Sequence, residues 1–298
     1  SGYFSIMSVK KKIGKVISLT LTVISYSMIT YVAGILFGSN SFSLKQIVFT
    51  LLPQNYYLYL FLTLYLLSPF INRLIAGLSQ KQYQRLLCVL IFSFVIWSTF
   101  INALCGIFDM QLTGVFATGR TTTDMGFNIC NFVTLYLIGG YIKKYPVKLK
   151  AKGFLMLSAG ILGCAVITAV SAIIFKNYSI DFLTYDSIFI VLQSVLLVVV
   201  FSNVSIKYSK ILNFAAGNTF GIYLIHWYFL SFFATHVFDI QKVIAGGFAG
   251  SALISIVTIV CAYICSLIFS SLFNLAVKPV SCWFKNTMIA GAKIFGDE

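Results

Sequence analysis

His226 is the histidine whose position and neighbours best suit chemistry. It lies about seven residues into an apolar segment that begins near residue 219, and Tyr223 precedes it by three residues. Residues three apart share a helix face, so we expect the two rings to be neighbours. Ionisable side chains inside a membrane span are costly and indicate function by default. His226 is therefore a candidate base or substrate contact; the alternative is an imidazole hydrogen-bonded to a neighbouring helix.

Asn131 and Arg120 are further candidate substrate contacts. Asn131 lies within an apolar segment, where its amide could bind a substrate or join two helices. Arg120 lies in the polar loop 118–124 and could hold an anionic or hydroxylated acceptor, or be a solvated loop residue. The sequence thus offers Tyr223, His226, Arg120 and Asn131 as a substrate-binding set.

Other signatures of chemistry are missing from the sequence. It has no P-loop, no GxGxxG, no GxSxG, no HExxH, and none of its seven acids lies in the middle of an apolar segment. The seven cysteines form no disulfide or metal pattern, and Cys261 and Cys265 read as small packing residues. We therefore expect no metal and no bound cofactor.

The composition identifies the environment in which these residues must be held. Hydrophobic residues make up 59% of the 298 residues and charged residues 9%, against roughly 25% charged residues in soluble domains. The apolar runs are about 20 residues long, the length a helix needs to cross a bilayer. Alternating strands of a membrane barrel are not found. The chain is predicted to be all-α, a polytopic helical membrane bundle, and its net charge of +14 is not read as a nucleic-acid site.

About eight transmembrane helices are predicted from the apolar segments. The fourth is short for a full crossing, so it is expected to begin earlier or to be shielded by protein. The segments are 16–37, 56–76, 86–105, 127–142, 153–175, 186–204, 219–238 and 243–275.

Lysine and arginine predict the orientation of these segments. Strict alternation places 17 of the 21 basic residues on one side, and five of the seven acids on the other. Basic loops stay in the cytosol. We expect a multi-pass protein of the cytoplasmic membrane with both visible termini cytosolic, and an interfacial cytosolic tail at 277–298.

Four segments together resemble the membrane-bound acyltransferase-3 family, and in particular its branch that acts on bacterial envelope polysaccharides. The start SGYF and the basic stretch after it are similar to the family's FFxxSGY/F segment. YLIGGYIKKY is similar to its GxYI+KY exit from a span, and GIYLIH to a late segment of the family. The four are SGYF (1–4), YLLSPFIN (65–72), YLIGGYIKKY (136–145) and GIYLIH (221–226).

The resemblance implies a reaction and its substrates. A cytosolic acyl-CoA, often acetyl-CoA, would be a co-substrate that donates its acyl group to a hydroxyl of an envelope glycan or lipid-linked sugar. The bilayer and these two substrates are the implied partners, with no nucleic acid. The family's basic cluster corresponds here to lysines that would contact the CoA phosphates, namely Lys10, Lys11, Lys12 and Lys15.

The resemblance also implies that part of the family's core lies upstream. That core has ten spans, and the SGY segment follows the first two. The principal catalytic histidine belongs to the first span and has no counterpart in residues 1–298. We therefore expect a single domain over 1–298 that is N-terminally incomplete and inactive alone. The codons before Ser1 should then encode the missing basic residue and histidine. His226 is the secondary catalytic candidate.

Two other functions remain open on the sequence. The chain could be a transporter or flippase of lipid-linked sugar that uses the same cavity without forming an ester. It could also be a non-catalytic membrane scaffold.

Overall fold

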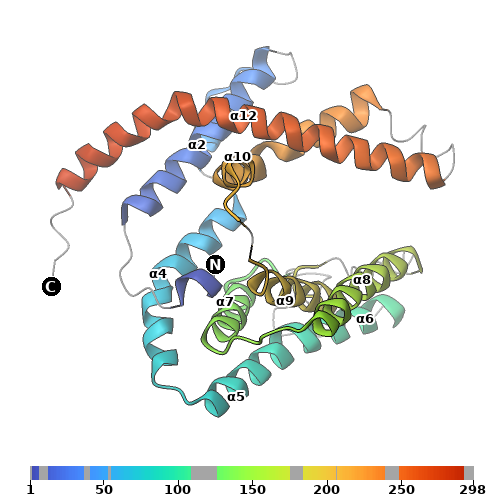
Figure 1. Cartoon of the computed structure of the whole chain (residues 1–298). Helices are drawn as coiled ribbons and strands as arrows, with labels where there is room; N and C mark the ends of the chain where they lie inside the picture. The colour runs from blue at the N-terminus through green and yellow to red at the C-terminus, as the bar shows by residue number, and fades with distance from the viewer. Residues whose placement is uncertain are drawn as a thin grey trace. The chain divides into compact units, whose positions relative to one another are not determined.

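The fold is helical wherever it is described. The computed structural model describes residues 2–6, 13–36, 41–52, 55–108, 126–174, 184–205, 207–238 and 248–291, and the regular elements in these ranges are helices (Figure 1). Six segments of the described chain are long and apolar enough to cross a membrane. The all-α, multi-pass membrane fold predicted from the sequence is thereby confirmed.

Each of the eight predicted apolar segments contains a helix. Two are shorter than the roughly 20 residues of a full crossing: α7 has 16 residues and α9 has 15. The short fourth segment was expected on the sequence. The eight are α2 (Ile13–Leu36), α4 (Tyr56–Ala76), α5 to α6 (80–108), α7 (Ile129–Lys144), α8 (Ala151–Ile174), α9 (Ile188–Ser202), α10 (Lys210–Phe232) and α12 (Phe248–Gly291).

The third segment is a helix with one wide turn. Helix α5 (Gln80–Ile91) continues through a π-helical turn, η1 (Phe92–Ile96), into α6 (Trp97–Phe108). Its start is fixed by Ser79, whose backbone N–H donates to the side chain of Gln82 at 2.9 Å in a capping box. The helix therefore begins before the apolar run that predicted it.

The contacts divide the chain into two compact units. Unit 1 comprises Ser1–Lys11 and Tyr56–Ile206, and unit 2 comprises Lys12–Asn55 and Lys207–Glu298. In unit 1, α7 packs against α1 (Gly2–Ser5), α4, α5 and α9 (Figure 1). Its residues Thr134, Tyr136 and Leu137 are buried. A short helix is tolerated in a membrane protein when neighbouring protein surrounds it, as here.

Unit 2 contains α2, α3 (Leu44–Leu51), α10, η2 (Phe233–Val237) and α12. Helix α10 begins at Lys210, where the Ser209 hydroxyl accepts a hydrogen bond from the Leu212 N–H. The predicted start near 219 is therefore wrong: polar Asn213 and Asn218 lie inside the helix rather than before it. Helix α12 has 44 residues, and its backbone continues through most of the predicted tail 277–298.

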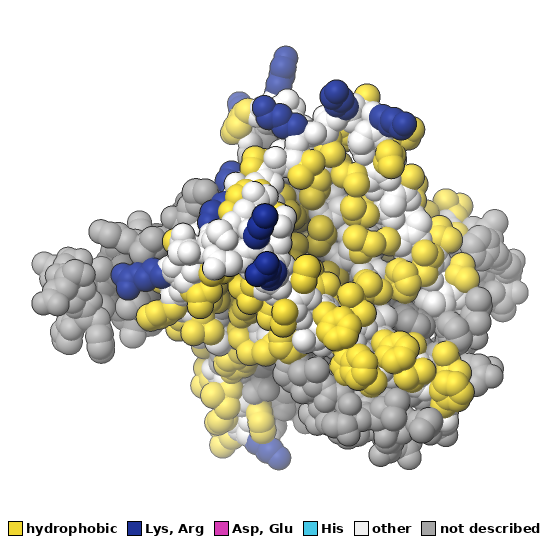
Figure 2. All heavy atoms as spheres, turned by 90° about the horizontal axis from the view of Figure 1, so that it is seen from below, with side chains coloured by type: hydrophobic (Ala, Val, Ile, Leu, Met, Phe, Trp, Pro, Cys, Tyr) yellow, Lys and Arg dark blue, Asp and Glu magenta, His cyan; other side chains and the backbone are white. Residues whose placement is uncertain are grey.

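The outer surface of the described helices is largely apolar. Figure 2 shows hydrophobic side chains over much of the face it draws, with Lys and Arg in small groups. On α8, Leu155 is 72% exposed and Leu162 is 67% exposed. Such exposure suits contact with lipid chains, which do not penalise apolar side chains.

Candidate functional site

The segment SGYF packs directly on the glycine pair of YLIGGYIKKY. A Cβ at Gly2 would overlap the Tyr136 carbonyl, and one at Gly139 would stand 2.9 Å from the Tyr3 backbone nitrogen. Glycines at both positions let the two backbones approach closely, as small residues do between membrane helices. The Lys143 ammonium lies 4.8 Å from the centre of the Tyr3 ring, within the range of a cation–π interaction.

The segment YLLSPFIN joins the same cluster through Asn72. Its side-chain nitrogen donates to the Ser5 carbonyl at 2.9 Å, and its oxygen accepts from the Tyr136 hydroxyl at 2.8 Å. Pro69 has no N–H to give to the Tyr65 carbonyl. The Ser68 hydroxyl donates to that carbonyl instead, at 2.7 Å. Three of the four segments that carry the resemblance therefore meet in unit 1.

Loss of the Asn72 amide should destabilise unit 1. Asn72→Ala would leave the Ser5 carbonyl and the Tyr136 hydroxyl without this partner. We expect the free energy of unfolding to fall by about 1–3 kcal/mol, the cost of a buried polar group left unsatisfied. Thermal unfolding of the purified protein in detergent measures the change. Gln84→Ala is the control, because it removes an exposed hydrogen bond to Tyr141; equal losses in both variants would contradict the role given to Asn72.

The fourth segment, GIYLIH, lies in unit 2. A Cβ at Gly221 would overlap the hydroxyl groups of Ser270 and Tyr26. One turn earlier, the Asn218 side-chain oxygen accepts from Asn274 at 2.9 Å and from the Ser270 hydroxyl at 3.2 Å. The segment therefore packs tightly on α12 through polar atoms.

His226 and Tyr223 are neighbours on α10, as the spacing predicted. Their ring centres are 6.0 Å apart. The Nδ1 atom of His226 lies 2.7 Å from the Tyr223 carbonyl oxygen. A carbonyl can only accept, so Nδ1 carries the proton and a neutral ring presents Nε2 as a proton acceptor.

The alternative that the His226 ring bonds to a neighbouring helix needs correction. Its ring bonds to its own helix, and among the described residues no other hydrogen bond to it is found. It lies sixteen residues after the start of α10, about 24 Å along the axis, because the helix begins at Lys210. Counted from the start of the helix, His226 falls past the middle of the candidate membrane span Lys210–Val237.

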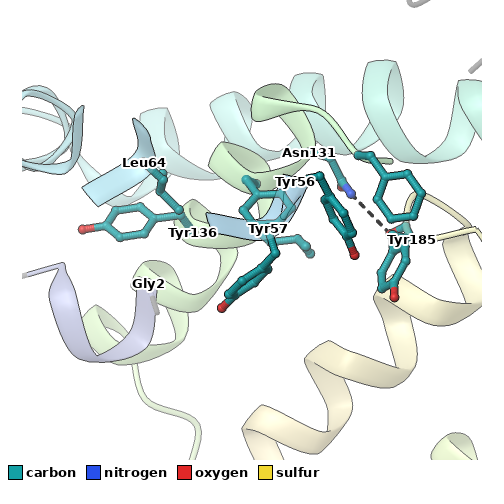
Figure 3. Close-up of a pocket in the computed structure, with 10 residues that line it drawn as sticks. Gly2, Tyr56, Tyr57, Leu64, Asn131, Tyr136 and Tyr185 are labelled. Carbon is teal, nitrogen blue, oxygen red and sulfur yellow. Dashed lines mark hydrogen bonds between the residues drawn. The ribbon is translucent and has the colours of Figure 1, made fainter. Parts of the chain in front are cut away.

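A pocket of about 280 Å³ opens in unit 1 beside Asn131 (Figure 3). It runs along α4 and α7 and is mainly aromatic. Tyr56, Phe127 and Tyr185 form its exposed rim; the Tyr56 and Phe127 ring centres are 4.3 Å apart, and those of Phe127 and Tyr185 are 5.0 Å apart. The lining is Gly2, Tyr56, Tyr57, Leu64, Phe127, Asn131, Phe132, Leu135, Tyr136 and Tyr185.

Asn131 holds the rim of this pocket in place. Its side-chain nitrogen donates to the Gly126 carbonyl at 3.1 Å and to the Tyr185 carbonyl at 3.3 Å. Gly126 has φ of +80°, and a Cβ there would stand 2.6 Å from the Asp186 backbone nitrogen. Only glycine suits this position. Asn131 is 1% exposed, and its side-chain oxygen has no hydrogen-bond partner in the described part of the chain.

Basic residues gather at the opposite end of the same helices. Arg73 is in the last turn of α4, and the Lys144 ammonium donates to the Ile75 carbonyl at 3.4 Å, which brings the end of α7 beside it. Tyr56, on the pocket rim, and Arg73 are 17 residues apart in α4, about 25 Å along its axis. Unit 1 therefore has a basic end and, at the other end of the same helices, an aromatic pocket whose lining residues carry no charge.

The structure tests the placement of only some predicted site residues. Tyr223 and His226 lie together in unit 2, whereas Asn131 lies in unit 1. Lys15 is exposed on α2. Arg120, Lys10, Lys11 and Lys12 lie outside the described residues. In the described chain, no three His, Cys, Asp or Glu side chains are grouped as metal ligands would be.

The rim residues Tyr56, Phe127 and Tyr185 were missed by the sequence analysis. Tyrosine and phenylalanine at the end of an apolar segment are also what the membrane interface favours. No spacing in the sequence joins these three residues, which come from separate segments. Of the residues that line the pocket, only Asn131 was identified from the sequence as a candidate substrate contact, because it is a polar residue in an apolar run.

The comparisons with known proteins agree with the arrangement of the four segments. Residues 1–274 match the acyltransferase-3 family, described as an acyltransferase domain. No curated protein and no solved structure matches the chain significantly. The match covers more than half of the chain, including all four segments and the pocket. The chain therefore belongs to the acyltransferase-3 family of membrane acyltransferases.

Proposed function

We propose that this chain transfers an acyl group, acetyl in the simplest case, from cytosolic acyl-CoA to a hydroxyl of a cell-envelope glycan or lipid-linked sugar. The acceptor oxygen attacks the thioester carbonyl, and the carbon–sulfur bond breaks. The acceptor's proton passes to a base and then to the departing sulfur. The products are an O-acyl ester and free CoA.

The separation of charge in unit 1 is the observation that carries this proposal. CoA is a polyanion, and phosphate groups pair with Lys and Arg. Arg73 and Lys144 stand at the basic end, on the side that the basic loops assign to the cytosol. The aromatic pocket at the other end offers an uncharged surface to a hydroxylated acceptor. Two substrates of opposite chemistry thus have separate surfaces on one unit.

The other candidate residues keep the roles that the sequence analysis predicted for them. Lys10, Lys11, Lys12 and Lys15 are proposed to contact the CoA phosphates as point charges, because lysine lacks the paired donors of arginine. His226, through Nε2, is proposed as a proton acceptor, secondary to the histidine that the family resemblance implies. Tyr223 lies beside it as a substrate contact.

Ester formation tests the proposal. Membranes that contain the full-length protein are incubated with isotopically labelled acetyl-CoA and host envelope glycan or lipid-linked precursor. We expect labelled acetyl to appear on the glycan and to be released by mild alkali, with mass spectrometry locating the ester. Transfer of the lipid-linked sugar across the membrane without any added acetyl would instead support a flippase.

The orientation can be checked independently. In a variant without native cysteines, single cysteines are placed at Lys148 and at Arg120 or Lys176. A membrane-impermeant maleimide added to intact cells should label a cysteine at position 120 or 176, because these positions are predicted to be outside. It should not label Lys148→Cys. Reversed labelling would place the basic end of unit 1 away from cytosolic CoA and overturn the donor side.

A further inference from the structure

We propose that the pocket of unit 1 binds one uncharged sugar ring of the acceptor, and that the acylated residue is a neutral pyranose rather than a uronic or other acidic sugar. This inference rests on the proposed function and adds the chemical class of the acceptor. Three properties of the pocket support it: its uncharged lining, its aromatic rings and its size.

The described lining offers no charged partner to a ligand. None of the ten residues that line the pocket carries a charge. A carboxylate placed there would lose its hydration without gaining a cation, which is costly in a partly buried site. The same argument excludes the phosphates of CoA. The pocket therefore suits a neutral ligand.

The aromatic groups suit a ring that has both apolar faces and hydroxyl groups. The rings of Tyr56, Phe127 and Tyr185 form a platform of three faces with interplanar angles of 54° and 49°, and the C–H face of a pyranose can stack on one of them. Figure 3 shows the hydroxyl groups of Tyr56, Tyr57 and Tyr185 directed to the same side of the view. The Tyr136 hydroxyl points away from them, consistent with its bond to Asn72. Stacking surface and phenolic hydroxyls thus lie side by side, as a sugar ring requires.

Asn131, which lines the pocket, keeps one buried acceptor without a partner among the described residues. Asn131 uses both hydrogens of its side-chain nitrogen on the Gly126 and Tyr185 carbonyls. This fixes the amide orientation and leaves the side-chain oxygen as a buried acceptor without a partner in the part of the chain described. A buried acceptor of this kind is unfavourable until a donor reaches it. The oxygen is fully buried, so a sugar hydroxyl can reach it only if the rim residues move.

The size limits what enters. A volume of about 280 Å³ is just below the range of roughly 300–1,000 Å³ that holds drug-sized ligands. One sugar ring with a short acyl group fits this space, whereas an oligosaccharide or the whole of CoA does not. The rest of the glycan would stay outside the rim.

The test is direct sugar binding to the full-length protein in phosphatidylcholine nanodiscs, which avoids sugar-based detergents. Methyl β-glucopyranoside and methyl N-acetyl-β-glucosaminide are the neutral probes, and methyl β-glucopyranosiduronate is the acidic probe. Saturation-transfer-difference NMR measures each at millimolar concentration. We expect saturable binding of at least one neutral probe and none of the acidic probe.

Variants then locate the binding. Tyr56→Ala and Tyr185→Ala each remove one face of the platform and should weaken binding of the neutral probe about tenfold. Tyr56→Phe and Tyr185→Phe keep the rings and should retain most of the stacking. The control is Tyr59→Ala, because Tyr59 is on the same helix as Tyr56, is 52% exposed and does not line the pocket.

Three outcomes would overturn the inference: no binding of either neutral probe, equal binding of the acidic probe, or binding that the alanine variants of Tyr56 and Tyr185 leave unchanged. Acyl transfer is measured separately on the same variants. If acyl transfer continues at the wild-type KM for the acceptor in both alanine variants, the proposed function is retained, but the pocket is not the acceptor site. If binding of the neutral sugar depends on the rim residues but no ester forms, the proposed acyl transfer is contradicted and the pocket is still a sugar-binding site.

Discussion

Replacing His226 by alanine is expected to lower acyl transfer per folded molecule by about 10²-fold, the low end of a general base's contribution, because His226 is secondary to the histidine that the family resemblance implies. Nδ1 lies 2.7 Å from the Tyr223 carbonyl oxygen, so Nε2 is the ring nitrogen that remains for a substrate. The ring is held by its own helix, so its orientation does not depend on a partner helix. This geometry suits a proton acceptor, one of the two functional roles that the sequence suggested for His226.

His226→Gln separates base chemistry from positioning. Glutamine can accept a hydrogen bond but cannot take up a proton near neutral pH, so its activity should fall as far as that of His226→Ala. His236→Gln is the control, since His236 lies in η2, near the end of the same apolar stretch. Initial rates are measured at saturating acetyl-CoA and acceptor, and are divided by the amount of monodisperse protein. Full activity in both His226 variants would contradict a catalytic role for His226 and indicate that it serves only in packing.

Replacing Gly221 by alanine should cost unit 2 much of its stability. The added Cβ would overlap the Ser270 and Tyr26 hydroxyls, so α10 and α12 could not keep their present separation. Overpacking of this kind costs typically 1–3 kcal/mol. The displaced hydroxyl of Ser270 would also weaken its bond to Asn218, which is now 3.2 Å long. Lower thermal stability in detergent and a lower yield of folded protein would show the effect.

Gly217 provides a matched control on the same helix. It lies four residues before Gly221, and a Cβ there would meet no atom within 4 Å. Gly217→Ala should therefore be neutral or stabilising, by up to about 1 kcal/mol, because alanine is the better helix former. Ser270→Gly should restore part of the stability that Gly221→Ala loses. If Gly217→Ala and Gly221→Ala are equally stable, the close packing of Gly221 against Ser270 and Tyr26 is contradicted.

The amino-acid sequence by itself determined the fold class, the eight helical segments and the family. A chain in hydrocarbon must satisfy its backbone hydrogen bonds internally, so an apolar run of about 20 residues is restricted to a helix. Hydropathy therefore located α2, α4 and α8 within about three residues at each end, whereas α12 begins about five residues later and ends about sixteen residues later than predicted. Hydropathy did not predict the start of α10 at Lys210, because Asn213 and Asn218 indicated a boundary near 219. Asparagine side chains can instead bond within the helix, as Asn218 does to the Phe214 carbonyl.

Only the tertiary structure decided which faces of these helices meet. Packed and lipid-facing surfaces are both apolar in a membrane protein, so hydrophobic periodicity does not distinguish them. The sequence could not show that Gly2 lies on Tyr136, that Gly221 lies on Ser270, or that Gly217 faces open space. For the same reason Tyr56, Phe127 and Tyr185, from three segments far apart in the chain, could be identified as one rim only after α4, α7 and the start of α9 were packed together.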